Sequence, residues 1–386
     1  MTLSLHGFTV FLRLIAQQSA ENIMKMLRYL FDVFRQYPFS YTSLVYLFIT
    51  MAFCYYPIFD HWIAGFIMMS LPLAILAGLI AACYLFVKQQ KIVATAGFIW
   101  VLCTFPLVKR AVGISSEKLN LNTVSFLKVL SFNGECFNQN QQSNKNLSAL
   151  RADIACLQEY SPNRTVEAQY ANNIVKLTRF DGNKLIGLAL FSQYPILKQY
   201  GKVWDRKNQP NINGFLCADI AYQQDTVRVV NVHLWSMGVR INLAFDALKK
   251  GNLRLFGTEL YDSFCRLKEG FEKRDEQMRE VESYVSGSKY PVIICGDFNE
   301  TPFGYSYGKL KLSFQNAFEE AGQGLGFTLN RQPYFARIDQ QFFSSEWHVQ
   351  SCKTMSGINI SDHFPVVANY ILKKTLKVSP VLVAER

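Results

Sequence analysis

The chain has 386 residues, of which 50% are hydrophobic and only 18% are charged, which argues against a single, wholly soluble domain. Its formal net charge of +11 is divided between two parts, since residues 1–110 hold 8 Lys/Arg and 3 Asp/Glu and residues 111–386 hold the remaining 32 and 26. A dedicated nucleic-acid-binding domain usually concentrates Lys/Arg on one face. The second part is only mildly basic, so composition gives weak support for nucleic acid as a partner.

Residues 1–37 are predicted to form an N-terminal lead-in. Apolar side chains stand there among polar ones, at Phe8, Phe11, Leu14 and Ile15. No small-residue cleavage site follows a short apolar core, so the segment is not an ordinary cleavable signal peptide. Met24 and Met26 are alternative start positions.

Three uncharged stretches follow, over residues 38–59, 62–87 and 92–108. A helix needs about 20 apolar residues to cross a bilayer core, so the second stretch qualifies most clearly and the first is adequate. The third is short, and a buried or interfacial helix is its alternative. We therefore predict a multi-pass integral membrane protein with a transmembrane region over residues 38–110 and the lipid bilayer as a partner.

The positive-inside rule predicts how this region is oriented. Cations precede the first stretch or separate the second from the third, at Lys25, Arg28, Arg35, Lys88 and Lys91. With three spans, the N-terminus lies in the cytoplasm and everything after residue 110 lies outside. Lys109 and Arg110 oppose this placement.

The nine cysteines do not indicate a zinc site. No CxxC pair or Cys/His ligand spacing is present, and Cys156 and Cys295 lie inside runs that favour buried strands. Buried free thiols are the expectation.

A soluble α/β domain is predicted over residues 125–372, after a linker at 111–124 and before a tail at 373–386. Short runs rich in β-branched residues recur there, bounded by turn-forming or polar residues, which favours strands. These runs are Leu127–Phe132, Ile154–Leu157, Leu185–Phe191, Val227–Leu234, Val292–Cys295, Ile338–Phe343 and Phe364–Ile371.

Between Leu234 and Pro291 the apolar spacing becomes helical. One apolar face is formed by Phe256, Leu260, Phe264, Leu267, Phe271, Met278, Val281 and Val285. The charged run Lys268–Glu282 is then expected to be the solvated face of a long helix.

Polar residues follow or end most of the predicted strands, where a rigid sheet displays catalytic groups. They are Asn133, Gln158, Glu159, His233, Asp297, Asn299, Asp339, Asp362 and His363. Each alone has a simpler explanation. Glu159 suits a solvated strand end, Gly296–Pro302 suits a turn, His233 suits a satisfied core histidine, and Asp339 suits an ion pair with Arg337. Their repetition at strand ends points to one site.

These residue types suit phosphate-ester hydrolysis, which requires neutralised oxygens, an activated water and a protonated leaving group. Glu159 and Asp362 are candidate ligands for a hard divalent cation, Mg²⁺ or Mn²⁺. Asn133 and Asn299 can donate to phosphate oxygens without adding charge. Asp339 and His363 suit a carboxylate–histidine pair, because histidine exchanges protons near neutral pH.

The motifs resemble the endonuclease/exonuclease/phosphatase superfamily, which has the deoxyribonuclease-I-like fold. The resemblance covers residues 125–372 and rests on four motifs in order: Cys-Leu-Gln-Glu (156–159), Gly-Asp-Phe-Asn (296–299), Arg-Ile-Asp (337–339) and Ser-Asp-His (361–363). It implies a four-layer α/β/β/α sandwich. Residues 187–196 look like the central strand and following turn of that family. The membrane-first layout, with Gly-Asp-Phe-Asn-Glu-Thr-Pro (296–302) and Gly-Gln-Gly-Leu-Gly-Phe-Thr (322–328), is similar to bacterial membrane-anchored members, which implies a bacterial inner-membrane location.

The resemblance also implies roles for single residues. Glu159 would bind the metal, with Asp362 in or near its shell, while Asn133 and Asn299 would hold the phosphate. His363 would be the general base, oriented by Asp339, and Asp297 would position the attacking water. His233 would be the acid or a phosphate-stabilising histidine. Gly134 and Gln340 stand where the family has a bulkier apolar residue and an aromatic residue, which affects pocket shape more than chemistry.

The sequence thus predicts a membrane-anchored, metal-dependent phosphoester hydrolase. Within that prediction, a nuclease and a phospholipid or sphingolipid headgroup phosphodiesterase both stay open. A catalytically silent membrane module that binds a phosphorylated ligand is the alternative of a different class. No protein partner is inferable.

Overall fold

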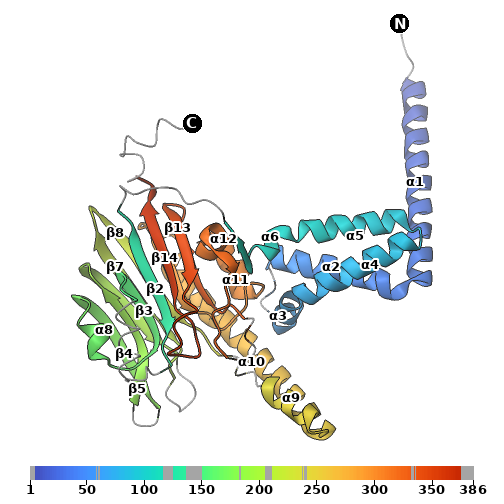
Figure 1. Ribbon diagram of the computed structural model, residues 1–386. Helices are drawn as coiled ribbons and strands as arrows, with labels where there is room; N and C mark the ends of the chain where they lie inside the picture. Colours follow the sequence, from blue (N-terminus) through green and yellow to red (C-terminus); the bar gives the residue numbers. More distant parts are fainter. Residues whose placement is uncertain are drawn as a thin grey trace. The chain divides into compact units, whose positions relative to one another are not determined.

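The computed structural model describes residues 5–57, 59, 61–115, 125–135, 150–181, 184–204, 211–236, 238, 241–331, 334 and 336–374. The chain divides into two compact units (Figure 1). The first comprises Met1–Phe53 and Ser70–Phe105, and the second comprises Cys54–Met69 and Pro106–Arg386.

The first unit is helical. It contains α1 (Leu5–Gln36), α4 (Leu71–Val87), α5 (Lys91–Cys103) and most of α2 (Pro38–Tyr55). Close helix packing depends on glycine, because a Cβ on Gly78 would lie 2.6 Å from a methyl carbon of Leu47. The buried apolar side chains of this unit come from all four helices: Val33, Leu44, Ala81, Ala82, Leu85, Val93 and Ala94.

By length and hydropathy, two helices among the described residues could cross a membrane, Pro38–Tyr55 and Lys91–Val108. The latter includes the short α6 (Phe105–Val108). The stretch 62–87, expected to be the clearest span, is instead two helices, α3 (Trp62–Met69) and α4, and it counts as a third span only if the bent pair is taken together. Pro72, in the first turn of α4, explains the break, because proline lacks an N–H and clashes with the preceding turn.

Within the described residues, the second unit is built on two six-stranded sheets (Figure 1). The first sheet has the order β10 (Gln315–Asn316), β12 (Asp339–Phe343), β9 (Val292–Asp297), β8 (Asp225–His233), β7 (Gly214–Tyr222) and β6 (Ile196–Val203). The second has the order β13 (Trp347–Thr354), β14 (Val366–Leu372), β2 (Leu127–Asn133), β3 (Ile154–Tyr160), β5 (Lys184–Ser192) and β4 (Asn172–Asp181). A small ribbon pairs β1 (Val112–Ile114) with β11 (Gln323–Leu325).

The alternation of strand side chains places the core between the two sheets. In β2, Leu127 and Val129 face the buried cluster between the sheets, whereas Leu130 and Phe132 face a second cluster on the outer side. In β8, Val229 belongs to the central cluster and Val230 to an outer one. Both central strands are therefore buried on two faces, as a layered sandwich requires.

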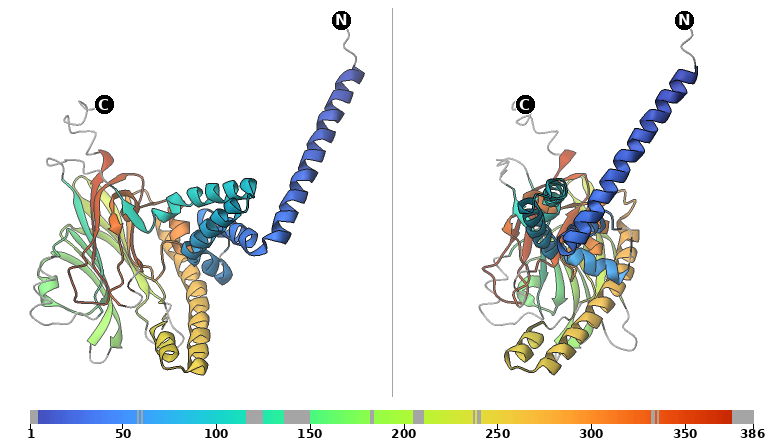
Figure 2. Two further views of the ribbon diagram at one scale, coloured as in Figure 1. Left: turned by 45° about the vertical axis from the view of Figure 1, so that its right-hand side comes forward. Right: turned by 90° about the vertical axis from the view of Figure 1, so that its right-hand side faces the viewer.

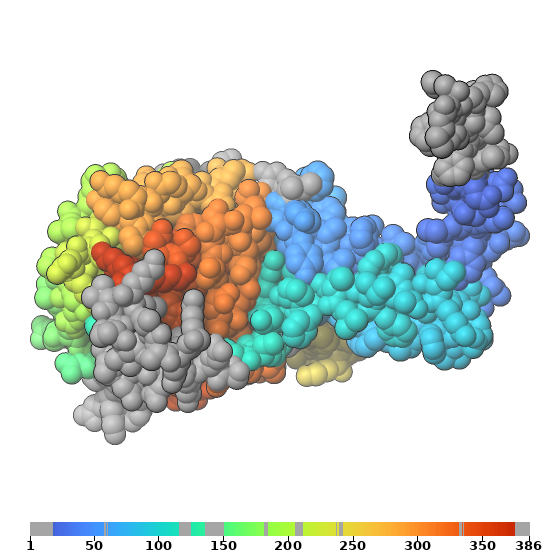
Figure 3. All heavy atoms as spheres, turned by 90° about the horizontal axis from the view of Figure 1, so that it is seen from above, coloured from blue at the N-terminus to red at the C-terminus, as the bar shows by residue number. Residues whose placement is uncertain are grey.

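Helices cover the outer faces. On the first sheet lies the 33-residue α10 (Leu253–Val285), which follows α9 (Ile241–Lys249) and whose Met278, Val281 and Val285 join the outer cluster. In the space-filling view α10 lies beside the orange surface formed by α11 (Tyr305–Lys311) and α12 (Ala317–Ala321) (Figure 3). Over the second sheet the described residues contain the short α8 (Arg164–Glu167). The predicted α/β fold with two packed sheets is confirmed.

Candidate active site

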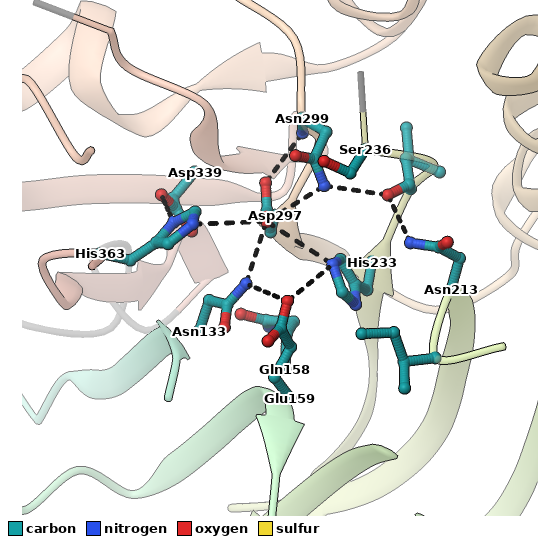
Figure 4. Close-up of polar contacts among 12 residues, drawn as sticks. Asn133, Gln158, Glu159, Asn213, His233, Ser236, Asp297, Asn299, Asp339 and His363 are labelled. Atoms are coloured by element: carbon teal, nitrogen blue, oxygen red, sulfur yellow. Dashed lines mark hydrogen bonds and ion pairs between the residues drawn. The ribbon is translucent and has the colours of Figure 1, made fainter. Parts of the chain in front are cut away.

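Strand direction brings the predicted polar residues to one edge of the sandwich. In each sheet the two central strands are parallel, β2 with β3 and β8 with β9. Near their carboxyl ends Asn133 pairs with Gln158 and His233 with Asp297, and Asp339 at the start of β12 pairs with Asp297. The carboxyl ends of four strands therefore meet across the two sheets (Figure 4).

A buried hydrogen-bond network fixes one sheet against the other at this edge. The side chain of Asn231 donates to the carbonyl oxygens of Leu157 at 3.0 Å and Ala189 at 2.9 Å. Its amide oxygen accepts a 2.6 Å bond from Gln158. Because these side chains are fully buried between the sheets, the network sets the spacing between β3 and β8.

Glu159 is displayed by an irregularity in its strand. The register between β3 and β5 shifts between Leu157 and Tyr160, and Glu159 has a φ of 48°. A bulge of this kind re-aims a side chain, and a non-glycine residue in the left-handed region indicates local strain at a functional position. Glu159 is thereby turned toward the site, where its side chain keeps 25% of its surface exposed.

Asp297 is the central acid of the site (Figure 4). Its Oδ2 accepts bonds from the side-chain amides of Asn133 at 3.1 Å and Asn299 at 3.2 Å. The Nε2 atoms of His233 and His363 lie 3.6 Å and 3.8 Å from the same oxygen. Burial raises the pKa of Asp297, and the nearby His363 opposes that shift.

The backbone conformation of the Gly-Asp-Phe-Asn motif explains why a glycine and an asparagine stand at its two ends. Gly296 has a φ of 148°, and a Cβ there would lie 1.8 Å from the carbonyl oxygen of Val232. Asn299 has a φ of 50°, and its backbone N–H donates to Asp297 at 2.8 Å. Asparagine tolerates this conformation better than most side chains, so the turn returns onto Asp297.

The amides of Asn133 and Asn299 are already engaged by site carboxylates and a carbonyl. Asn133 donates to Glu159 at 3.3 Å as well as to Asp297. Asn299 donates to the carbonyl oxygen of Leu234 at 3.0 Å as well as to Asp297. Since a side-chain amide has two N–H groups, both residues hold Asp297 in place. Binding of substrate phosphate by either residue, as predicted from the sequence, requires one of these bonds to be exchanged.

His363 and Asp339 form a buried pair. His363 Nδ1 lies 2.9 Å from Asp339 Oδ2, and the Ser361 hydroxyl accepts a 3.1 Å bond from the backbone N–H of His363. Burial lowers the pKa of His363, but the carboxylates of Asp339, Asp297 and Asp362 raise it more, to about 10. In the absence of other cations the imidazole is therefore held in its charged form.

His233 occupies the opposite side of Asp297. Its Nε2 lies 3.8 Å from Glu159 Oε1, and its buried Nδ1 has no hydrogen-bond partner among the described residues. The ring is only 2% exposed.

Asp362 lies beside His363 but is directed partly to solvent. Its carboxylate is 3.0 Å from Arg331 and 3.9 Å from His363 Nε2. Its backbone N–H donates to Glu135 at 3.0 Å. Burial and the carboxylates of Asp362 and Glu159 raise the pKa of Glu135. Glu135 was not identified from the sequence as a site residue, because the motif there stops at Asn133 and Gly134.

The acids of the site fit a divalent cation. Ligand atoms of Asp297, Asp339 and His363 lie within 4.8 Å of one another, and Asp339 Oδ1 is buried with no hydrogen-bond partner among the described residues. Carboxylate oxygens are what a hard cation prefers. The predicted ligands Glu159 and Asp362 lie outside this compact group, although Glu159 shares Asn133 with Asp297.

A pocket of about 650 Å³ opens beside Glu159 and His233. Its walls include two cations from different elements, Arg179 of β4 and Arg266 of α10, which motif reasoning had not identified. The other lining residues are Ile186, Asn211, Ile212, Asn213, Trp235, Ser236, Gly238 and Glu269.

Lys268–Glu282 was expected to be the solvated face of α10. That expectation is wrong for the middle of the segment. Arg274 is fully buried, with Nη2 3.8 Å from Glu300, and Nη1 donates to the carbonyl oxygen of Trp235 at 3.3 Å. Burial lowers the pKa of Arg274. Glu300 in turn accepts bonds from the N–H groups of Tyr305 and Ser306 at the start of α11. The expectation fails because α10 is covered on two sides: Met278, Val281 and Val285 pack on the sheet, and Arg274 contacts Trp235 and Glu300.

Solved structures similar to this chain include the human Nocturnin catalytic domain (16% identity, 64% of this chain and 94% of that one, TM-score 0.46). Others are an endonuclease/exonuclease/phosphatase from Beutenbergia cavernae (17%, 64% and 72%, 0.48) and a mannosyl-6-phosphatase from Bacteroides thetaiotaomicron (16%, 64% and 100%, 0.44). None of the curated proteins compared with the chain matches it.

The family model described as "Endonuclease/Exonuclease/phosphatase family" matches residues 130–363, more than half of the chain. The matched range begins within β2, just before Asn133, and ends at His363, so it contains every acid and histidine of the site described above. The chain belongs to the endonuclease/exonuclease/phosphatase family, whose members are in general phosphoester hydrolases.

Proposed function

We propose that the protein is a membrane-anchored, divalent-metal-dependent phosphoester hydrolase in which the His363–Asp339 pair activates water. The observation that carries the proposal is the 2.9 Å contact between His363 Nδ1 and Asp339, which leaves Nε2 directed at Asp297 Oδ2, 3.8 Å away. An attacking water between these groups would pass its proton to Nε2 and be oriented by Asp297.

Proton transfer to Nε2 requires His363 to be neutral before the reaction. Three carboxylates hold it in the charged form, as its raised pKa shows. A divalent cation held by Asp297 and Glu159, with Asp362 or Asp339 near it, would offset that negative charge, polarise the phosphoryl oxygen and favour the neutral imidazole. Asp297 and Glu159 both accept bonds from the Asn133 amide, and their carboxylate oxygens are donors that suit Mg²⁺ or Mn²⁺.

The other groups would act on the substrate. His233 Nε2 faces the site between Glu159 and Asp297, from where it can donate to a phosphate oxygen or to the leaving oxygen. Arg179 and Arg266 line the adjoining pocket and would bind the anionic ester. Asn133 and Asn299 would keep Asp297 aligned for the water.

Membrane anchoring is supported by the two helices that are long and apolar enough to span a bilayer. With the bent pair α3–α4 counted as a third span, the distribution of Lys and Arg favours an enzyme in the inner membrane of a bacterium with its catalytic unit outside. Labelling of an exposed residue of the catalytic unit by a membrane-impermeant reagent on intact cells would test that side; labelling only after lysis would contradict it.

Hydrolysis of bis-(p-nitrophenyl) phosphate by the purified full-length protein tests the chemistry. We expect turnover with Mg²⁺ or Mn²⁺, none in EDTA, and a loss of at least about 10²-fold in His363→Ala and Glu159→Gln. His61→Ala and Glu276→Gln are matched controls, because His61 and Glu276 are exposed and absent from the site.

Unchanged turnover in either site variant would contradict the proposed roles. A folded protein that binds phosphorylated ligands with saturating metal but turns over neither diesters nor p-nitrophenyl phosphate would instead be the catalytically silent module.

A further inference from the structure

The helical hairpin of α9 and the first half of α10 exposes an apolar surface. It projects from the β-sandwich of the second unit (Figure 2). The exposed large apolar side chains on it are Leu243, Phe245, Leu248, Leu253, Leu255, Leu260, Tyr261 and Phe264. Ala244 and Ala247 on the other side of α9 are buried. We call the exposed set the hairpin surface.

The hairpin surface is continuous with the seat of another apolar helix. Phe66 of α3 stacks on Phe264 at 4.9 Å and contacts Phe271 at 5.3 Å, and Trp62 contacts Phe264 at 5.7 Å. Residues 253, 260, 264 and 271 lie one above another on α10, because seven residues are close to two helical turns. The face that binds α3 therefore continues, uncovered among the described residues, to the tip of the hairpin.

The helix α3 indicates what covers that face. It has no charged residue, and one residue, Ser70, separates it from α4. Together the two bent helices are long and apolar enough for a broken membrane span or a re-entrant loop. If this pair of helices enters the bilayer, the segment that does so begins on α10, against which α3 packs. Bilayer lipid is then within reach of the hairpin surface, and the exposed cations Lys250 and Arg254 at the tip suit lipid phosphates.

The hairpin surface also leads into the proposed active site. Arg266 and Glu269 line the pocket and follow Phe264 on the same helix, and Arg266 Nη1 lies 3.4 Å from the carbonyl oxygen of Gly238 on the pocket wall. A hairpin that inserts in the interface would therefore hold the pocket mouth at the level of lipid headgroups.

We propose that the hairpin surface inserts into the lipid bilayer and that the substrate of the pocket is a phosphoester carried on a lipid headgroup. The substrate part rests on the proposed function, whereas insertion does not. Substrate would enter between Arg179 and Arg266 from the membrane plane, with its acyl chains left among the hairpin side chains.

Insertion is tested by photocrosslinking in the full-length protein reconstituted into vesicles of phosphatidylethanolamine and phosphatidylglycerol. A benzophenone amino acid replaces Tyr261, which is 69% exposed, or Leu197, which is 60% exposed. Leu197 lies near the start of β6. The residues on either side of it, Ile196 and Lys198, pair with Ile220 and Asp219, at the opposite end of β7 from Gly214, which pairs with His233. Leu197 is therefore a matched control away from the site. Crosslinks to labelled lipid at 261 and not at 197 are expected. Equal crosslinking at both positions, or crosslinks from 261 to a second copy of the chain, would overturn insertion.

The substrate class is tested with a double variant, Leu253→Glu and Tyr261→Glu, both at exposed positions. The control is the single variant Leu197→Glu. In vesicles that contain a fluorescent headgroup phosphoester, we expect the double variant to lose at least about tenfold in rate and the control to lose none. Hydrolysis of soluble bis-(p-nitrophenyl) phosphate should not change in either. Equal loss on both substrates, or none on either, would contradict the lipid substrate. If the wild-type protein cleaves neither substrate, the proposed function fails, while crosslinking at 261 still decides insertion.

Discussion

The two sides of Asp297 differ in how firmly their histidines are held. On one side, His363 is bonded to Asp339 at 2.9 Å, and its backbone is bonded to Ser361. On the other, His233 has a buried Nδ1 without a partner among the described residues and adjoins the pocket with its two arginines. The bonded side is suited to moving one proton at a fixed place, and the open side to accommodating a ligand.

The largest expected effect comes from removing the charge that both sides share. Asp297→Asn keeps the shape but loses the oxygen that four side chains approach, so we expect kcat to fall by about 10³-fold. Burial disfavours the charge, as the raised pKa shows, whereas the bonds from Asn133 and Asn299 favour it, so the melting temperature should change little. Steady-state kinetics and a thermal melt measure the two effects. A large loss of stability with little loss of kcat would make Asp297 a structural residue.

The next largest effects distinguish the His363 side of Asp297 from the pocket side. Asp339→Asn removes the partner that charges and orients His363, and we expect kcat to fall by about 10²-fold or more with KM nearly unchanged. Arg266→Gln removes one cation of the pocket, and we expect KM to rise by about tenfold with kcat nearly unchanged. The same pattern in both variants would show that the two sides do not have separate roles.

A smaller effect concerns the scaffold of the open side. A Cβ on Gly304 would lie 2.0 Å from Cδ of Glu300, which stands beside the buried Arg274 and thus behind Trp235 of the pocket. Gly304→Ala should destabilise the protein by about 1–3 kcal/mol and raise KM. Gly257→Ala, a glycine in α10 with open space around it, is the matched control. Denaturation that is identical in the two variants would contradict this packing.

The smallest expected effect is a dependence of stability on pH in EDTA. The pKa of His363 is raised from 6.5 to about 10 in the folded protein, so its charged form contributes stability in full below pH 6.5. That contribution is lost as pH rises to about 10. The difference in melting temperature between the wild-type protein and His363→Gln should therefore shrink from pH 6 to pH 10. A difference that grows over this range would contradict the charge assignment.

Much of the fold and of the site could be predicted from the sequence because local pattern and order suffice for them. Alternating apolar residues define the central strands, and polar residues at strand ends, such as Asn133 and Asp297, converge once those strands are parallel in pairs. The break before α4 was also within reach, since Pro72 stands in the sequence.

Other features depend on contacts between distant segments. Arg274 looks like a solvated charge until Trp235 and Glu300 are brought onto it. The exposed apolar tip of α10 follows the same periodicity as its buried end, so spacing alone could not separate Leu260 from Met278. Likewise, the engagement of both N–H groups of Asn133 depends on the exact approach of two sheets.

The bond between Asn231 and Gln158 has a consequence for how such an enzyme can change its preference. Asn231 precedes His233 by two residues and Gln158 immediately precedes Glu159, so the distance across the reacting centre is set inside the core. Trp235 and Ser236 line the pocket only after β8 has ended. In the proposed hydrolase, we therefore expect substitutions in that wall to change which ester is accepted while the distance across the site stays fixed, so substrate range and chemistry become separable targets for engineering.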